Sequence, residues 1–186
     1  MTRIVRQHRE AEVQLWFMDE ARVGQKGRNT HVWYERGVRP TAPIDRRFDS
    51  TYLFGAVRPG TDEAFALVLP EVSTAMMNLF LDGFSRSLSA NAHAILVLDR
   101  AGWHRASRLE RPANLSLIHL PAYSPEFNPA ERVWQYMREN WLSHRLLDTY
   151  DDIVEACCEA WNKLTALPGV LASLTNYPYL RRVRTS

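Results

Sequence analysis

The sequence predicts an α/β fold with one mixed sheet, in a single domain. A chain of 186 residues is long enough to bury one core, and 46% hydrophobic with 24% charged residues is ordinary for a globular protein. Apolar runs of strand length follow one another in the first half, whereas in the second half they alternate with helical patterns. Consecutive strands can form an antiparallel meander, and strands separated by helices can add in parallel.

The first half contains four strand-sized runs bounded by glycine, proline and polar residues. The first follows an arginine-bearing lead, and the second follows a loop rich in glycine. The segment before the third is irregular by composition, and a turn joins the third to the fourth. These predicted strands are 13–19, 31–35, 51–57 and 64–69.

The second half alternates helices with two further strands. Ser73 is a suitable N-cap for the first helix, and the strand that follows is apolar throughout, as expected of burial on both faces. The predicted order is a helix at about 73–89, a strand at 93–99, a short basic helix at 103–111, a strand at 115–120, a helix from Asn128 or Pro129 to about 142, and a helix from Asp151 or Asp152 to about 166. The chain beyond Pro168 is expected to be irregular.

This order is that of a ribonuclease-H-like fold, a five-stranded mixed sheet flanked by helices. We expect a lead at 1–12, the folded domain at 13–167 and a tail at 168–186. In such a fold the first and fourth core strands are neighbours. Asp19 and Asp99, which close the runs at 13–18 and 94–98, would then end side by side.

Glu131, near the start of a strong helix, is the third candidate carboxylate. With Asp19 and Asp99 it could hold two Mg²⁺ or Mn²⁺ ions about 3.5–4 Å apart, the arrangement that cleaves phosphodiesters. Each acid also has a purely structural explanation: ending a strand, capping a turn or, for Glu131, completing a capping box with Asn128. Glu126 is the alternative third ligand, whereas Glu20 would point to the opposite face from Asp19.

The basic residues are unusual in kind, because 21 of the 23 are arginine and only Lys26 and Lys163 are lysine. Arginine suits phosphate, although codon bias in a GC-rich genome explains the composition equally well. A cluster of arginines follows Asp99, where these side chains could flank a nucleic acid backbone. The cluster consists of Arg100, Arg105, Arg108 and Arg111.

Three segments of the chain resemble DDE transposases, most closely the bacterial insertion-sequence enzymes related to the mariner group. They are 17–21 (FMDEA), 98–104 (LDRAGWH) and 121–134 (PAYSPEFNPAERVW), and the resemblance extends over about 13–165. It places the family's acidic triad on Asp19, Asp99 and Glu131. It implies a metal-dependent DNA endonuclease that also performs strand transfer, with two Mg²⁺ or Mn²⁺ ions.

The resemblance also implies partners and contacts. The expected partner is double-stranded DNA, at the element ends and at the target, bound by a homodimer with an upstream helix-turn-helix segment or protein. His104 matches a histidine common in the family, and it could contact the scissile phosphate or a metal-bound water, or only bond a backbone carbonyl. Further possible DNA contacts are Arg100, Arg105, Arg108 and Arg28.

Two features depart from the family pattern. Only 31 residues, 100–130, separate Asp99 from Glu131, which predicts a trimmed loop near Ala113 and Asn114. The position after the second aspartate is often asparagine in relatives but is Arg100 in this chain.

Other classes remain open or are disfavoured on composition. Alternatives to a transposase are a ribonuclease H or junction resolvase, and a catalytically silent DNA-binding or dimerising remnant. Cys157 and Cys158 are adjacent, and no Cys-x-x-Cys pair is present to hold zinc. The N-terminus has no cleavage signal and no apolar run reaches membrane-span length, so we expect a cytoplasmic protein with no membrane partner. The resemblance implies that it is bacterial and nucleoid-associated.

Overall fold

The computed structural model describes residues 2–25, 49–104, 106–122, 124–143 and 145–181. Its five strands form one sheet in the order β3-β2-β1-β4-β5. They are β1 (Glu12–Gly24), β2 (Ser50–Val57), β3 (Ala64–Leu69), β4 (Ala92–Leu98) and β5 (Leu115–His119). The first three strands are antiparallel neighbours, and β4 and β5 add in parallel beyond β1. The predicted ribonuclease-H-like topology is confirmed, whereas the predicted strand at 31–35 lies outside the described residues.

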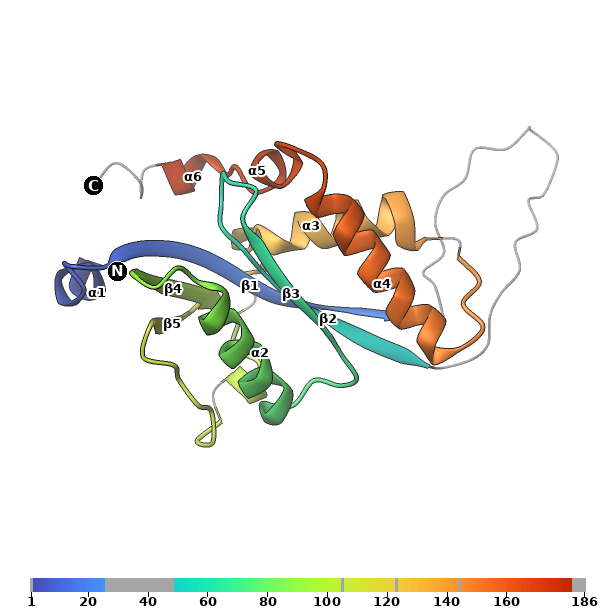
Figure 1. Cartoon of the computed structure of the whole chain (residues 1–186), viewed down its shortest axis with the longest axis horizontal. Helices are drawn as coiled ribbons and strands as arrows, with labels where there is room; N and C mark the ends of the chain where they lie inside the picture. Colours follow the sequence, from blue (N-terminus) through green and yellow to red (C-terminus); the bar gives the residue numbers. More distant parts are fainter. Residues whose placement is uncertain (1, 26–48, 105, 123, 144, 182–186) are drawn as a thin grey trace.

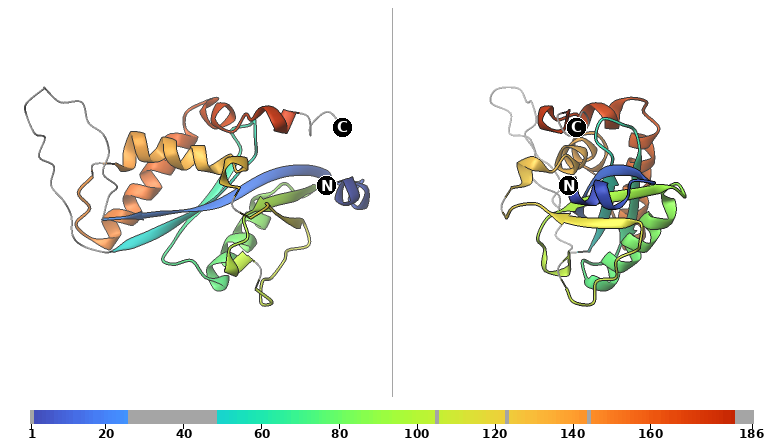
Figure 2. Two further views of the ribbon diagram at one scale, coloured as in Figure 1. Left: turned by 180° about the vertical axis from the view of Figure 1, so that it is seen from behind. Right: turned by 90° about the vertical axis from the view of Figure 1, so that its left-hand side faces the viewer.

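Helices cover both faces of this sheet (Figure 1). They are α1 (Thr2–Gln7), α2 (Thr74–Ser87), α3 (Ala130–Met137), α4 (Tyr150–Thr165), α5 (Val170–Leu174) and α6 (Pro178–Arg181). Two 3₁₀ turns, η1 (Gly102–His104) and η2 (Pro125–Phe127), and one π turn, η3 (Arg138–Leu142), complete the set. Figure 2 shows α2 on one face and α3, α4 and α5 on the other. Among the described residues, no helix combines the length and apolar character needed to cross a membrane.

The alternation of side chains along β1 determines which residues reach which face. Trp16 and Met18 belong to the core cluster under α2, and Phe17 belongs to the cluster under α3, α4 and α5. Because successive side chains in a strand point to opposite faces, Asp19 lies on the α3 side and Glu20 on the α2 side.

Strand β1 is longer than predicted and continues past Asp19 to Gly24. Antiparallel pairing with β2 continues from Asp19 opposite Gly55 to Gly24 opposite Ser50. Asp19 therefore sits within a hydrogen-bonded ladder that fixes its backbone, rather than at a strand end.

The predicted basic helix at 103–111 is wrong, since among the described residues of that segment the short turn η1 is the only helical element. Contacts with α2 determine the path instead. The Asn78 side chain accepts a hydrogen bond from the Glu110 N–H (2.9 Å) and donates to the Arg108 carbonyl (3.1 Å). Trp103 and Leu109 pack against the core beneath α2.

The predicted irregular tail is also wrong as far as it is described, because α5 and α6 pack on the core. Leu171 and Leu180 are buried in the cluster that includes α3. The Asp62 carboxylate, on the turn between β2 and β3, accepts hydrogen bonds from the N–H groups of Gly169 (2.7 Å) and Ala172 (3.0 Å). These contacts anchor the start of α5 to a turn more than 100 residues earlier.

Candidate active site

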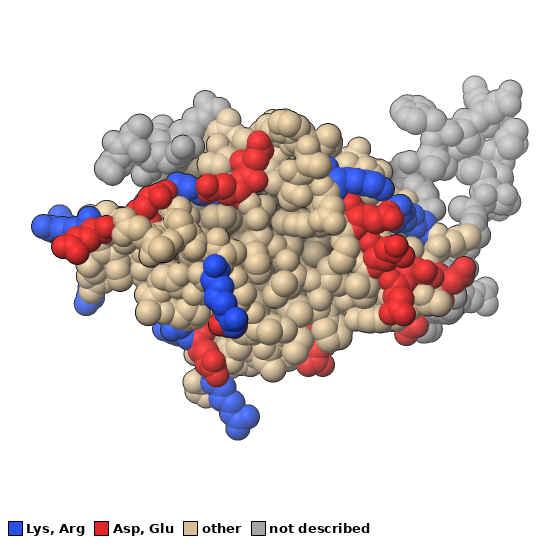
Figure 3. All heavy atoms as spheres, in the orientation of Figure 1, with Lys and Arg blue, Asp and Glu red and all other residues tan. Residues whose placement is uncertain are grey.

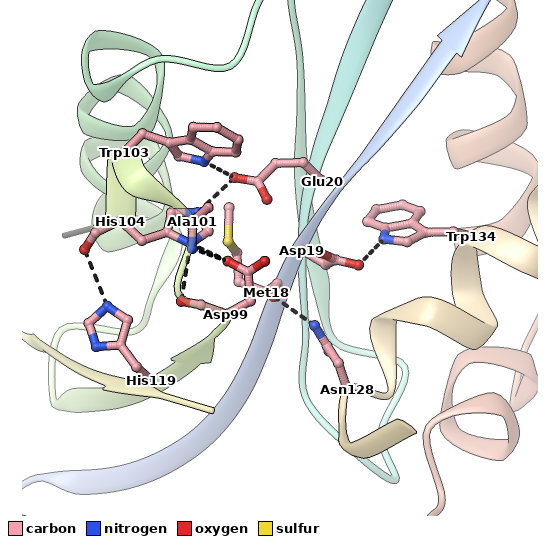
Figure 4. Close-up of polar contacts among 10 residues, drawn as sticks. All are labelled: Met18, Asp19, Glu20, Asp99, Ala101, Trp103, His104, His119, Asn128 and Trp134. Atoms are coloured by element: carbon pink, nitrogen blue, oxygen red, sulfur yellow. Dashed lines mark hydrogen bonds and ion pairs between the residues drawn. The ribbon is translucent and has the colours of Figure 1, made fainter. Parts of the chain in front are cut away.

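The parallel pairing of β1 with β4 brings Asp19 and Asp99 together. The register joins Glu12 to Ala92 and Phe17 to Val97, a constant offset of 80 residues. Asp99 is the first residue after β4, and the same offset places it beside Asp19. The sequence-based expectation that the two aspartates are neighbours therefore agrees with the strand register (Figure 4).

The start of α3 is fastened to β1 next to Asp19. The Asn128 side chain donates from Nδ2 to the carbonyl of Met18 (3.0 Å), and its Oδ1 accepts from the Ala130 N–H (3.1 Å). One turn into the helix, the Trp134 indole donates to Oδ2 of Asp19 (3.1 Å). Glu131 precedes Trp134 by three residues, so both project from the same side of α3. The helix thereby presents Glu131 toward Asp19.

The predicted capping box at α3 does not form, because the N-cap of the helix is Pro129 rather than Asn128. The Asn128 side chain still accepts from the Ala130 N–H, but its own N–H donates to the Pro125 carbonyl (2.8 Å) rather than to Glu131. The Glu131 side chain is exposed and makes no hydrogen bond or ion pair with the described residues. Its carboxylate therefore has no structural partner in this part of the chain.

Burial and neighbouring negative charge raise the pKa of Asp19 to about 8, from an ordinary value of 3.8. Burial is the largest cause, followed by the charges of Glu131 and then Glu20. Hydrogen bonds from the Glu20 N–H and the Trp134 indole oppose the shift without cancelling it. The site therefore concentrates more negative charge than its surroundings neutralise, which is the electrostatic character of a cation site.

A second set of contacts supports Asp99 from the α2 side (Figure 4). The buried His104 ring lies 2.8 Å from Oε1 of Glu20 through Nε2 and 2.8 Å from Oδ1 of Asp99 through Nδ1. The Trp103 indole donates to the same Glu20 oxygen (2.9 Å), and the Ala101 N–H donates to Oδ1 of Asp99 (2.8 Å). Burial opposes a charge on His104, but the bonds and charges of Glu20 and Asp99 prevail and raise its pKa.

The other predicted site residues lie in different surroundings. Arg100 and Arg108 are exposed, and the Arg100 Nε donates to the Leu120 carbonyl (3.0 Å). Arg105 and Arg28 lie outside the described residues. Glu126, the alternative third ligand, is exposed in η2 and is not among the charges that act on Asp19. His104 is buried against two carboxylates rather than open to solvent.

The oxygen-rich set of Asp19, Asp99 and Glu131 suits a hard divalent cation by its chemistry. As the side chains stand, no three His, Cys, Asp or Glu residues in the described ranges are gathered closely enough to hold a metal ion. Glu131 is exposed and its side chain can rotate toward Asp19, whereas Asp19 is held by Trp134 and one oxygen of Asp99 is held by the Ala101 N–H. The residues therefore fit a cation that draws Glu131 toward the two aspartates.

Three supporting residues were not anticipated from the sequence. The sequence patterns assigned Trp134 no role in the site, placed Glu20 only on the far face, and gave Asn128 only a role as a helix cap. Alternation along β1 indicated where Glu20 points, but its partner His104 is 84 residues away in the chain. No local pattern specifies such a contact.

Comparison with known proteins defines the class of this fold and site. The family model described as "DDE superfamily endonuclease" matches residues 14–154. The chain is 50% identical over 123 residues to the uncharacterized protein y4pE/y4sA of Sinorhizobium fredii (strain NBRC 101917 / NGR234), covering 66% of this chain and 91% of that protein. The chain belongs to the DDE superfamily endonucleases.

Solved structures share the fold at low sequence identity. A pre-cleavage Mos1 transpososome matches with a TM-score of 0.65 at 19% identity, over 86% of this chain and 50% of that one. The Mos1 mariner paired end complex with Mn matches at 0.62 and 19%, over 88% and 56%. The catalytic core domain of BIV integrase matches at 0.54 and 16%, over 92% and 95%. The chain thus spans about half the length of the Mos1 chains.

Proposed function

We propose that this chain is the catalytic domain of a transposase that cleaves DNA phosphodiesters and transfers the cut strands. Asp19, Asp99 and Glu131 are its catalytic carboxylates and metal ligands. The observation that carries the proposal is the convergence of β4 and α3 on Asp19. Asp19 lies half-buried where they meet, and burial together with the charges of Glu131 and Glu20 raises its pKa.

The cofactor we propose is a pair of Mg²⁺ or Mn²⁺ ions. Asp19 and Asp99 would hold one, and Asp19 and Glu131 the other. When bound, such ions supply charge stabilisation for the oxygen that attacks phosphorus and for the oxygen that leaves it. The related Mos1 mariner paired end complexes have been solved with Mn and with Mg, in support of this choice. Trp134 fixes one oxygen of Asp19, so the protein sets the position of the shared ligand before DNA arrives.

The proposed substrate is double-stranded DNA, at the ends of the element and at the target. Mos1 has been solved as a paired-end complex with the left transposon end and as a strand transfer complex, in support of two DNA ends held by a homodimer. Exposed Arg100 and Arg108 follow Asp99 and could contact the phosphate backbone. The side of the molecule seen in Figure 3 bears scattered basic side chains and a group of acidic ones near α4, so we place the DNA on another side.

An upstream helix-turn-helix segment or protein would supply recognition of the element ends, and the reaction would take place at the nucleoid of a bacterial cytoplasm. Genomic DNA beside the gene, searched for inverted repeats, would provide the substrate sequence.

Cleavage of a duplex carrying such a repeat tests the proposal, with Mg²⁺ or Mn²⁺, for the intact chain and for Asp99→Ala. We expect metal-dependent nicking that Asp99→Ala reduces by at least 100-fold. Cleavage of RNA–DNA hybrids in preference to the duplex would indicate a ribonuclease H instead. Duplex binding without cleavage, unchanged by Asp99→Ala, would indicate a silent DNA-binding remnant.

A further inference from the structure

Glu20 is a buried carboxylate that the proposed chemistry does not use. It neighbours Asp19 in sequence but lies on the opposite face of β1, and its side chain is only 7% exposed. Burying a carboxylate is unfavourable unless hydrogen bonds compensate it. Two donors do so here, the Trp103 indole and the His104 ring, both directed at Oε1.

The contacts continue from Glu20 to Asp99. His104 donates through Nε2 to Oε1 of Glu20 (2.8 Å). Its Nδ1 faces Asp99, where it donates to the backbone carbonyl (3.3 Å) and lies 2.8 Å from Oδ1 as an ion pair. Since carboxylate and carbonyl oxygens only accept hydrogen bonds, this geometry directs both ring nitrogens as donors. The carbonyl of His104 also accepts from Nε2 of His119 (3.2 Å), so β5 fixes the backbone of the turn.

The two oxygens of Asp99 are not equivalent. Oδ1 accepts from the Ala101 N–H and lies 2.8 Å from Nδ1 of His104 as an ion pair. Oδ2 makes no hydrogen bond or ion pair within the described ranges, and the side chain is 55% exposed. A carboxylate with one oxygen fixed and the other open keeps a single orientation for a ligand that approaches from solvent.

We propose that Glu20 is a positioning residue, which holds His104 so that His104 holds Asp99 in the orientation that binds a divalent cation. The proposal rests on the proposed function, because it assigns Asp99 as a metal ligand. Glu20 itself would touch neither metal nor DNA. Asp19 and Asp99 would thus be held from opposite faces of the sheet, by Trp134 and by the Glu20–His104 pair respectively.

Glu20→Met tests the inference, because methionine fills a similar volume but offers the two donors no carboxylate oxygen. Gln14→Met is the matched control. Gln14 lies on the same strand, is 6% exposed and accepts a hydrogen bond from the Trp16 indole (3.0 Å) as Glu20 does from Trp103. Glu20→Gln keeps an acceptor oxygen for both donors and serves as the conservative rescue.

The readouts are binding of Mn²⁺ alone by calorimetry, thermal unfolding in EDTA, and duplex cleavage by the full chain. We expect both methionine variants to unfold at similarly lowered temperatures in EDTA. Glu20→Met should weaken Mn²⁺ binding by about 10- to 100-fold and lower kcat at saturating DNA with it. Gln14→Met should bind Mn²⁺ within about twofold of the parent chain, and Glu20→Gln should recover most of the loss.

Several results would overturn the inference. They are Mn²⁺ binding by Glu20→Met within twofold of the parent, an equal loss in Gln14→Met, or a loss in Glu20→Gln as large as in Glu20→Met. A parent chain that neither binds Mn²⁺ nor cuts DNA would instead refute the proposed function, and the inference with it. The two failures are therefore distinguishable from the parent chain alone.

Discussion

Asp19 determines how the protein without bound cations responds to pH. Its pKa is about 8 in the folded chain against 3.8 ordinarily, so the folded state holds this proton more tightly than the unfolded state. The resulting contribution to the free energy of unfolding is complete below pH 3.8 and is lost as pH rises through 8. We expect stability in EDTA to decline over this range.

Asp19→Asn should remove most of that decline. At pH 8 the amide should raise the free energy of unfolding by about 1–3 kcal/mol over the parent, after allowance for solvent reaching this half-buried group. Urea unfolding in EDTA at pH 5 and pH 8 measures both chains. Parallel pH profiles for the two proteins would contradict the assigned shift.

The choice of third carboxylate is also a matter of single side chains. The charge of Glu131 helps to raise the pKa of Asp19, and its side chain has no partner among the described residues. Glu126 is not among the charges that raise this pKa. Glu131→Gln should therefore lower the rate of Mg²⁺-dependent duplex cleavage by at least 100-fold, because a neutral amide binds the cation poorly. Glu126→Gln, an identical change five residues earlier, should stay within about twofold. Equal losses, or the reverse ranking, would move the ligand to Glu126.

The packing of α3 on the sheet depends on one glycine. Gly55 lies opposite Asp19 in β2, and a Cβ at this position would approach Cη2 of Trp134 to 2.4 Å. Because Gly55 has no side chain, the indole can approach β2 closely enough to donate a hydrogen bond to Oδ2 of Asp19. The sequence pattern of a strand interior gives no reason for a glycine, but this contact does.

Gly55→Ala should destabilise the chain by about 1–3 kcal/mol through overpacking and should lower cleavage by displacing the indole from Asp19. Trp134→Phe shortens the ring that a Cβ would strike and removes the N–H donor. The two changes should therefore be non-additive, with Gly55→Ala costing less in the Trp134→Phe background. Urea unfolding of the four chains in this cycle measures the coupling. Additive losses would show that the alanine clashes with something other than the indole.

The elements that formed as predicted are those with strong local signals. Ser73 caps α2, with Oγ accepting from the Met76 N–H, and the apolar strand at 93–99 appears as the fully buried β4. The helix predicted from Asp151 or Asp152 begins at Tyr150, because Thr149 and Asp152 form a reciprocal capping box. The capping and hydrophobic patterns within these segments were therefore enough to predict the elements, with boundaries shifted by one or two residues.

Elements held by distant contacts were missed. Segment 103–111 has helical composition, but bonds from Asn78 and the inward turn of His104 toward Glu20 give it a different path. Nor could spacing distinguish Glu131 from Glu126. Support for Glu131 comes from Asn128, which bonds the Met18 carbonyl and so sets how α3 meets β1.

At the scale of the whole molecule, the C-terminal helices α5 and α6 pack against the core that lies beneath the site. Leu171 of α5 lies in the cluster that contains Ala130, Val133 and Trp134 of α3. The helix that carries Glu131 and Trp134 therefore rests partly on residues beyond 168, which the sequence patterns had assigned to a tail. Stability and site geometry should be coupled through this cluster.

Leu171→Ala tests the coupling, with Leu167→Ala as its control. Leu171 is 1% exposed, whereas Leu167, four residues earlier, is 38% exposed. Removing the buried side chain leaves a cavity, so Leu171→Ala should lower the free energy of unfolding by about 2–4 kcal/mol. Leu167→Ala should lower it by less than about 1 kcal/mol. Urea unfolding measures both, with a shifted midpoint and an unchanged slope expected for a two-state chain.

Because α3 loses part of its support, Leu171→Ala should also reduce duplex cleavage under conditions where it remains folded. Equal stability of the two variants would mean that α5 contributes nothing to the core and that the catalytic domain ends before it.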